Sequence, residues 1–547
     1  MTSQADNPAA SSPPAMQQIS PGIAAKFNEF GPAYRWFAVA TAMLGSLATL
    51  LPATVINVAI PEIMGAYGIG QDQAQWLATG FLAASTITML ANAWMVHAFG
   101  VRFTFVTAIA CFSVGSIGGL LAPSIDMLIF VRVFQGAAAG LITPLSMLIM
   151  FQVFPPDQRG RAMGIFSMGV VMAPALGPSL GGLIIDALSW RYIFFLELPL
   201  SFVAITLGTL FLTERETDGP RDSFDWTGLI LVSIFVMTIL VGLTEGQDRG
   251  WHENFVMFCL ITAGVSLVAF IWWELVVEKP LLHLRLFMIK GYAPAAAVTF
   301  VFGAGLYGST YLAPLFLQTV QGSTALSAGL LLMPAGFTMA VVFPISGAMA
   351  DKVSPRRPIM IGVAIFALSC ALLTNVDVNT PFLVMTFWVI IGRVGLGMVM
   401  PSIQAASLAR LPLHLISQGS GANNFVRQMG GAFGINLTAI FLAQRTQFFS
   451  DGLTASQTAD NTATMEVLDI IASLLANAGL PELTQSAVAY GFLGQMVYFK
   501  AYMLAFRDSF YLLTWVFVLT LIPAFLIGKD RPAPIEAIPN KSPAAAK

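Results

Sequence analysis

Ionisable residues that interrupt long apolar stretches are the first candidates for chemistry in this sequence. Arg132 lies a turn or two inside one end of an apolar stretch, and Glu197 lies several residues into another. An ionisable side chain within a membrane span is costly, by about 2.5–3.5 kcal/mol on insertion scales, and is therefore a candidate for function. Burial favours the neutral form of a carboxyl group, whereas a nearby arginine favours its charged form. A glutamate that alternates between these environments can carry protons, so Glu197 and Arg132 are candidates for proton coupling.

Each of these charged residues also has a purely structural interpretation. Glu197 can make a structural hydrogen bond near the membrane surface, and backbone carbonyls can satisfy the guanidinium of Arg132. Arg393 and Arg427 are further arginines within apolar stretches, and both are candidates for substrate binding or gating. Arg427 lies near the end of its stretch, where its long side chain can also reach water.

The composition predicts the elements that position these residues. Hydrophobic residues make up 56% of the 547 residues and charged residues only 10%, compared with about 25% in soluble domains. A membrane-spanning helix needs about 20 apolar residues, and about 14 such windows occur, so the sequence predicts an all-α membrane protein. The windows are 36–60, 75–97, 102–122, 127–152, 163–186, 192–212, 226–243, 255–276, 292–318, 327–350, 358–374, 381–400, 422–443 and 503–527.

The same composition excludes several classes of function. The 26 basic and 28 acidic residues leave a net charge of −2, which gives no electrostatic basis for binding nucleic acid. The cysteines and histidines are scattered without the spacing of a metal site, so we expect no bound metal. No nucleophile motif, phosphate-binding loop or dinucleotide-binding loop occurs in the sequence. We therefore expect neither enzyme activity nor a cofactor, and an ion gradient rather than bound ATP as the energy source.

The distribution of basic residues predicts the orientation in the membrane. Most loop arginines and lysines fall on the side of the N-terminus, and basic residues are few on the other side. Cytoplasmic loops carry this excess, so we predict a multi-pass protein of the bacterial inner membrane with both termini in the cytoplasm. Residues 1–34 should form a disordered cytoplasmic tail without a cleavable signal, and residues 528–547 a second tail.

Two short segments recur at nearly the same offset in the second part of the chain. Residues 132–136 match residues 393–397, and the weaker segment 93–98 matches 347–352. This repeat predicts two pseudo-symmetric six-helix halves with two helices inserted between them. The predicted boundaries are 35–212 for the N-terminal half, 213–290 for the inserted helices and a cytoplasmic linker, and 291–527 for the C-terminal half. Parallel repeats of this kind are typical of transporters with one site between the halves.

Small residues recur every four positions in the fifth window. They are Gly169, Ala173, Gly177 and Gly181, with Pro174, Pro178 and Gly182 among them. Small residues at this spacing let helices approach closely in lipid, and the prolines bend the helix. We predict that this face packs against the other half, where a bent helix can rock without opening a leak. Ordinary close packing is the simpler interpretation.

Several of these motifs resemble signatures of the major facilitator superfamily. Residues 173–182 (Ala-Pro-x-x-Gly-Pro-x-x-Gly-Gly) resemble its antiporter signature, and Gly347-x-x-x-Asp351-Lys352-x-x-x-Arg356 resembles its loop signature. Arg132-x-x-Gln135-Gly136 resembles its fourth-helix signature. Residues 51–61, which include Asn57, and residues 424–434, which include Arg427, look like signatures of the 14-span drug:H⁺ antiporters. The chain is most similar to the EmrB/QacA-like multidrug exporters.

The resemblance implies a fold and a function. The fold is the major facilitator fold with about 14 transmembrane helices. The function is proton-coupled efflux of amphipathic or lipophilic compounds by alternating access, together with a periplasmic adaptor and an outer-membrane channel. Asp351 would act as a gating latch, and Lys352 and Arg356 would either pair with it or follow the rule for cytoplasmic loops. Asn57 and Arg427 are candidate substrate or gating residues by the same resemblance.

The sequence departs from the family pattern at four positions. The acid of the first-helix signature is replaced by Pro52, the loop Gly and Asp of the first half by Ala93 and His97, and an Asn by Glu197. Proton coupling through the usual first-helix acid is therefore not expected.

The outer loop 444–502 contains an amphipathic stretch, which either binds a partner or folds back on the bundle. Two other functions remain open for the whole chain. One is dedicated export of a single metabolite, such as a siderophore, fatty acid or antibiotic, and the other is a membrane receptor that does not transport.

Overall fold

The computed structural model describes residues 20–215, 223–289, 291–409, 411–412, 415–458, 460–479 and 481–528. These residues form helices and no β-strand, which confirms the all-α prediction. Each of the 14 apolar windows coincides with a helix. They are α2 (Tyr34–Tyr67), α3 (Gln71–Phe99), α4 (Val101–Leu120), α5 (Ile125–Val153), α6 (Arg159–Ala187), α7 (Leu198–Phe211), α8 (Trp226–Arg249), α9 (Asn254–Val276), α10 (Tyr292–Thr319), α11 (Ala325–Lys352), α12 (Arg356–Leu373), α13 (Phe382–Leu408), α14 (Ile416–Ala455) and α16 (Glu482–Leu526).

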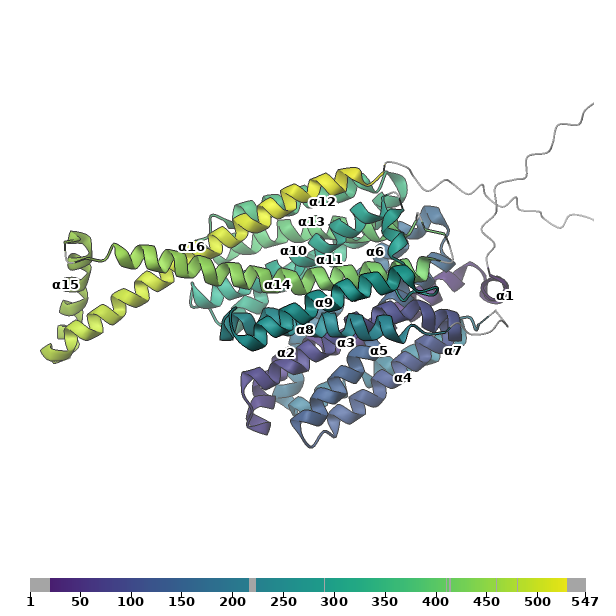
Figure 1. The fold of residues 1–547 in the computed structure, drawn as a ribbon, viewed down its shortest axis with the longest axis horizontal. Coiled ribbons are helices and arrows are strands. Elements are labelled where there is room, and N and C mark those ends of the chain that lie inside the picture. Colours follow the sequence, from purple (N-terminus) through teal and green to yellow (C-terminus); the bar gives the residue numbers. More distant parts are fainter. Residues whose placement is uncertain are drawn as a thin grey trace, which may run out of the picture.

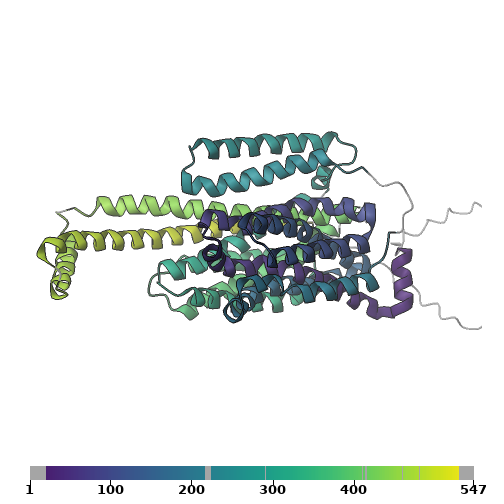
Figure 2. The same ribbon diagram turned by 90° about the horizontal axis from the view of Figure 1, so that it is seen from below.

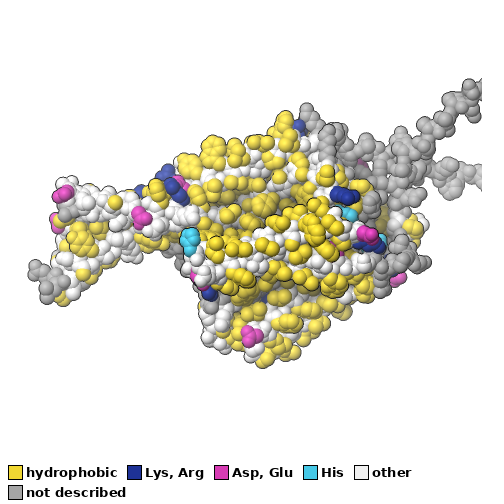
Figure 3. Space-filling model, in the orientation of Figure 1, with side chains coloured by type: hydrophobic (Ala, Val, Ile, Leu, Met, Phe, Trp, Pro, Cys, Tyr) yellow, Lys and Arg dark blue, Asp and Glu magenta, His cyan; other side chains and the backbone are white. Residues whose placement is uncertain are grey.

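Twelve segments of the described chain are long and apolar enough to cross a membrane. α6 and α14, which are both rich in glycine, are not among these twelve. On the face of the bundle shown in Figure 3, apolar side chains cover much of the surface, as expected for helices that cross lipid.

The helices form two bundles, with the inserted pair outside them (Figures 1 and 2). Helices α2–α5 and α7 pack mainly within one bundle, and α10, α12–α14 and α16 mainly within the other, whereas α6 and α11 make their most extensive contact with each other, across the two bundles. α8 and α9 form a hairpin at the periphery (Figure 2). Because α8 contacts α3 from one half and α14 from the other, this hairpin touches both halves.

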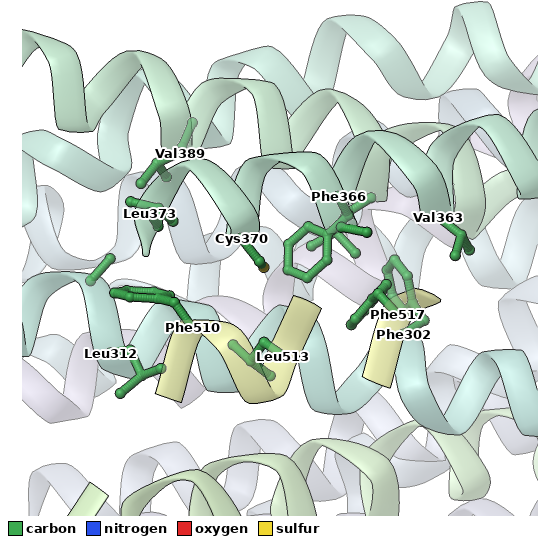
Figure 4. Packing of buried hydrophobic residues seen from close by; sticks show 14 of the residues in the cluster. Phe302, Leu312, Val363, Phe366, Cys370, Leu373, Val389, Phe510, Leu513 and Phe517 are labelled. Atoms are coloured by element: carbon green, nitrogen blue, oxygen red, sulfur yellow. The ribbon is translucent and has the colours of Figure 1, made fainter. Parts of the chain in front are cut away.

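Close complementary packing holds the helices together in each half. In the C-terminal half, the rings of Phe366 on α12 and Phe517 on α16 lie 4.3 Å apart beside Phe302 of α10 (Figure 4). Because lipid tails are as apolar as these side chains, contact geometry rather than burial from water stabilises the bundle. Gly362 and Gly395 show how close the contact is, since a side-chain carbon on either would overlap the backbone carbonyl of the other.

Two helices continue far beyond the bundle and form a projection, which comprises residues 444–502. α14 has 40 residues and α16 has 45, so α14 alone is about 60 Å long, about twice the thickness of the hydrocarbon core. α15 (Thr462–Asn477) connects their far ends (Figure 1). At the base, Arg445 of α14 donates from Nε to Asp508 Oδ2 of α16 at 2.6 Å.

The projection corrects the prediction of an outer loop. Hydropathy windows predict where lipid contact ends, whereas the α14 and α16 helices continue beyond the bundle without interruption (Figure 1). The expected amphipathic stretch is α15, whose first turn is capped by Asn461 accepting from the backbone N–H of Ala463 at 3.1 Å. Only Thr464 and Leu468 of α15 are buried, so this helix does not fold back on the bundle.

Both ends of the described chain lie at the end of the bundle opposite α15 (Figure 1). We call this end the inner end and the opposite one the outer end, in keeping with the predicted orientation. The predicted tail 1–34 is in part helical, because α1 (Pro21–Phe30) buries Ile23 and places Phe27 against Tyr34, with ring centroids 5.1 Å apart. The predicted tail 528–547 lies outside the described residues beyond Gly528, as do residues 1–19.

Candidate functional site

Arg132 lies on α5 in a buried polar cluster of the N-terminal half. Its Nε donates to the carbonyl oxygen of Leu77 on α3 at 3.1 Å, and its Nη1 donates to Gln135 Oε1 at 3.1 Å. The guanidinium carbon lies 4.3 Å from the centroid of the Phe81 ring, a cation–π contact. Because Arg132 is fully buried, these three neighbours replace the water that its charge loses.

Gln135 connects this arginine to the buried carboxyl group of Glu197. The Nε2 of Gln135 donates to Glu197 Oε1 at 3.1 Å and to Ser116 Oγ on α4 at 2.7 Å. Within the described residues, Arg132 Nη2 and Glu197 Oε2 have no hydrogen-bond partner. The predicted pair is thus brought together through one amide, and each member keeps an unused polar atom.

Glu197 lies at a break between two helices, rather than inside the continuous span predicted for residues 192–212. The 3₁₀ helix η3 (Trp190–Phe194) ends before it, and α7 begins after it with Pro199 in the first turn. Proline is accepted there because the first turn of a helix has no partner for its N–H groups. The Glu197 side chain makes no cap for α7 and instead faces Gln135.

The bridging roles of Gln135 and Ser116 were not predicted. Gln135 was quoted only as part of the fourth-helix motif, although its spacing of three from Arg132 places both on one helix face. Ser116 carries no comparable signal, because its role depends on how α4 packs against α5.

The small residues of α6 face α2 of the same half, which corrects the predicted contact with the other half. A side-chain carbon on Gly169 would lie 2.5 Å from the methyl carbon of Met43, and one on Gly181 would lie 2.8 Å from a methyl carbon of Val55. The remaining small residues are Ala173, which is fully buried, Gly177, which faces Thr54, and Gly182, with nothing within 4 Å. The side chains of Pro174 and Pro178 lie outside the described residues. A four-residue spacing defines a close-packing face but does not specify its neighbour.

The close contact between the halves lies nearer the start of α6, at the inner end. A side-chain carbon on Gly164 would overlap the carbonyl oxygen of Phe343 on α11, and one on Gly160 would overlap that of Gly347. The two helices therefore touch backbone to backbone, which only glycine allows.

Asp351 fastens this contact from the end of α11. Its Oδ1 accepts from the backbone N–H of Gly160 at 2.6 Å, and its Oδ2 accepts from that of Arg161 at 2.8 Å. These are free N–H groups in the first turn of α6, where the helix dipole also favours a negative charge. A carboxylate of one half thus caps a helix of the other half, which is the geometry of a latch.

The expected pairing of Lys352 and Arg356 with Asp351 is not what the structure shows. Both Asp351 oxygens accept from backbone N–H groups of α6. Lys352 is exposed, and the guanidinium carbon of Arg356 lies 3.6 Å from the centroid of the Phe525 ring. Arg356 therefore contacts α16 rather than Asp351.

We expect Asp351→Ala to open the inner end. Loss of two charge-assisted hydrogen bonds, each contributing about 1.5–3 kcal/mol, should raise the population of the inner-open state at least tenfold. The measurement is the labelling rate of a cysteine placed at Ser167, a fully buried residue at the half-to-half contact, in a background without native cysteines. Asp377→Ala, at an exposed loop aspartate, is the matched control. Equal labelling rates at Ser167 in Asp351→Ala and Asp377→Ala would contradict the role of Asp351 as a latch.

Arg393, the repeat copy of Arg132, has different partners. Its Nη2 donates to Thr310 Oγ1 of α10 at 2.8 Å, and its Nη1 has no partner within the described residues. No carboxylate is paired with it in the described part of the chain, in contrast to the cluster around Arg132. The pseudo-symmetry of the halves therefore does not extend to the polar cluster.

Arg427 lies where α14 crosses α5. Its Nη2 donates to Asn424 Oδ1 at 3.2 Å, and Asn424 Nδ2 donates to Met147 Sδ on α5 at 2.9 Å. Arg427 is half-buried and its Nε has no partner within the described residues. Asn57 lies on α2, but its side chain is outside the described residues.

The contacts between the halves gather at the inner end. Besides the α6–α11 contact, Ser420 Oγ donates to the carbonyl oxygen of Pro144 at 2.9 Å, and Asn92 Nδ2 donates to Ser417 Oγ at 3.3 Å. These residues come from the inner halves of α3, α5 and α14. The structure is therefore closed at its inner end.

Comparison with known proteins agrees with this architecture. The family model of the Major Facilitator Superfamily matches residues 42–435. The chain belongs to the major facilitator superfamily. Members of this superfamily are transporters rather than enzymes.

Relatives within the superfamily support the drug:H⁺ antiporter family. The chain is 32% identical over 412 residues to the multidrug export protein EmrB of Haemophilus influenzae, covering 73% of this chain and 79% of that protein. It is 28% identical over 495 residues to a multidrug resistance protein B homolog of Mycobacterium tuberculosis, covering 89% of each. The fold resembles that of a double-tryptophan mutant of XylE, with a TM-score of 0.59, 13% identity and coverage of 91% of this chain and 97% of that one.

Proposed function

We propose that this transporter expels amphipathic or lipophilic small molecules from the cytoplasm in exchange for protons. The observation that carries the proposal is the buried chain from Arg132 through Gln135 to Glu197, in which Glu197 Oε2 has no hydrogen-bond partner among the described residues. A carboxyl group that is neutral in one state and charged in another can couple proton movement to the transport cycle. The relatives named for multidrug export support the class of substrate.

In the proposed cycle, Glu197 takes up a proton when the outer end is open and releases it when the inner end is open. Protonation removes the negative charge of Glu197 and with it the attraction to the positive charge of Arg132 on the other side of the bridging Gln135. It therefore changes which conformation is favoured. Opening of the inner end must then break the Asp351 latch and separate the backbone contact of Gly164 with Phe343. Substrate leaves in the opposite direction while the outer end is open.

The test uses inside-out vesicles that contain the protein and hold an acid interior. Lipophilic cations and weak acids are added one at a time, and a pH-sensitive dye reports proton release. We expect release that requires both the protein and a transported compound. Absence of release with every compound, from vesicles in which the protein is folded, would contradict proton-coupled export.

We also propose that the projection binds a periplasmic adaptor. Residues 444–502 extend beyond the length that a bilayer requires and carry exposed aromatic side chains, including Phe448, Tyr490, Phe492 and Tyr498. Aromatic residues are enriched at protein interfaces, and a lipid-facing role is not available so far outside the bundle. In the predicted orientation this surface is periplasmic.

We expect the double substitution Phe492→Glu and Tyr498→Glu to separate transport from drug resistance. Drug resistance of whole cells should fall at least about tenfold, because a charge in the centre of an interface costs several kcal/mol. Transport by purified protein in vesicles should be unchanged. The control is Gln318→Glu, which adds a charge at an exposed polar position of α10, outside the projection. Equal loss of activity in vesicles would contradict the adaptor role.

A further inference from the structure

The inserted hairpin contains two buried acidic residues that the proposed transport cycle does not use. Asp225 precedes α8, and Glu274 lies in the last turn of α9, so both are at the inner end of the hairpin. They are only 9% and 4% exposed, respectively. Carboxyl groups are rarely buried to this extent without a specific partner.

One carboxylate oxygen of Asp225 accepts hydrogen bonds and the other does not. Its Oδ1 accepts from the backbone N–H of Gly228 at 2.8 Å, which caps α8, and from Trp273 Nε1 of α9 at 2.8 Å. Its Oδ2 is buried without a hydrogen-bond partner among the described residues.

Glu274 repeats this arrangement. Its Oε2 accepts from the backbone N–H of Leu282 at 3.0 Å, in the connection that follows α9. Its Oε1 is buried and, among the described residues, also has no partner. Each carboxyl group is thus held in place through one oxygen, and the second oxygen remains available.

The two oxygens without partners, Asp225 Oδ2 and Glu274 Oε1, both lie close to the position that a side chain at Gly228 would occupy. A side-chain carbon built on Gly228 would overlap Asp225 Oδ2 and would lie 2.7 Å from Glu274 Oε1. The absence of a side chain at Gly228 is what lets the two oxygens approach each other. Two buried carboxylates that approach the same point repel each other when both are charged, and a proton shared between them removes this repulsion.

We propose that Asp225 and Glu274 form a proton-binding site that holds one proton between Asp225 Oδ2 and Glu274 Oε1. The bound proton turns one oxygen into a donor and leaves the other as its acceptor, so a single proton satisfies both buried atoms. The pair then carries one negative charge instead of two.

A proton fits this site better than a metal ion. Calcium takes six to eight oxygen ligands and magnesium an octahedral set, whereas two carboxylate oxygens converge here. Among the described residues, no group of three or more His, Cys, Asp and Glu side chains is close enough to hold a metal.

Other titratable and charged groups belong to the elements around the pair. They are Glu278, Lys279, His283 and Arg285 after α9, His97 at the end of α3, and Arg427 on α14. Glu278 is exposed and is followed by the buried Leu281 and Leu282, whose chain Glu274 holds. The shared proton therefore links Asp225, at the start of α8, to Glu274, which holds the connection that follows α9 and leads into the C-terminal half.

The first measurement is infrared spectroscopy of the whole protein in lipid nanodiscs at neutral pH. A protonated carboxyl group gives a C=O stretch that shifts in D₂O. We expect the wild-type protein to show an absorbance of this kind that is lost in both Glu274→Gln and Asp225→Asn. Each amide can donate to the remaining carboxylate, so neither variant needs the proton. Glu278→Gln, at the exposed neighbour, should leave the absorbance intact.

The second measurement is thermal stability as a function of pH. A proton held by the folded protein but not by the unfolded chain makes stability fall as the pH rises. Relative to Glu274→Gln, we expect the midpoint of unfolding of the wild type to decrease as the pH rises from about 4, the pKa of a carboxyl group in the unfolded chain, through neutral pH. The histidines and lysine nearby are common to both proteins, so the difference between the two curves reports the pair.

Three results would overturn the proposal. One is an unchanged C=O absorbance in both amide variants. Another is failure of Glu274→Gln to fold, because the amide should imitate the protonated acid. The third is stabilisation of the wild type, but not of Glu274→Gln, by millimolar Na⁺, Ca²⁺ or Mg²⁺, which would show that the pair binds a metal cation instead.

Discussion

Replacement of Glu197 by glutamine should abolish substrate-driven proton release while the protein stays folded. Glutamine has nearly the same size, and its oxygen can still accept from Gln135, but it cannot exchange a proton. Loss of a proton-transfer group commonly costs a factor of about 10²–10⁴, so we expect at least a tenfold fall in proton release. Substrate binding, measured by fluorescence in detergent, should change much less.

The control for this prediction is Asp126→Asn. Asp126 is an exposed acid in the first turn of α5, the helix that carries Arg132. It should retain coupled release. If Glu197→Gln behaves like Asp126→Asn, the proton is carried elsewhere, and the buried chain through Gln135 has a structural role.

Replacement of Gly164 by leucine should stop transport by preventing closure of the inner end. A side-chain carbon at this position overlaps the carbonyl of Phe343 on the opposite half, and the backbone cannot yield as a flexible side chain would. The outer-open state would be lost, so we expect proton release to fall at least about tenfold, the change in an equilibrium that 1.4 kcal/mol produces. A cysteine at Ser167 should become accessible at the same time.

Gly329→Leu is the matched control on α11. Gly329 is exposed, and nothing lies within 4 Å of a side-chain carbon built there. Transport by this variant should resemble that of the wild type. Wild-type transport by Gly164→Leu would show instead that the halves do not need this backbone contact.

The helices could be predicted from the sequence because lipid imposes a simple requirement on them. Each span must be apolar over about 20 residues, and all 14 windows became helices. The projecting ends of α14 and α16 were not predicted, because a helix outside lipid needs no continuous apolar sequence. The helix break at Glu197 was missed for a related reason, since the apolar pattern continues across it from Trp190 to Phe211.

The site was only partly predictable. Arg132 and Glu197 stood out because charges are rare in apolar stretches, but the amide between them depends on the packing of α4, α5 and η3. The donors to Asp351 had no sequence signal, because they are the backbone N–H groups of Gly160 and Arg161. The small residues of α6 predicted close contact, and only the fold decided that the contact is with α2.

The length of α14 has a mechanical consequence. One end of this helix carries Ser420 and Asn424, which bind the other half at the inner end, and the opposite end carries Phe448 in the projection. A stiff rod about 60 Å long that tilts by about 10° moves its far end by about 10 Å. The projection thus acts as a lever arm. A protein bound to its tip would be displaced, or would oppose the movement, each time the inner end opens on the opposite side of the membrane.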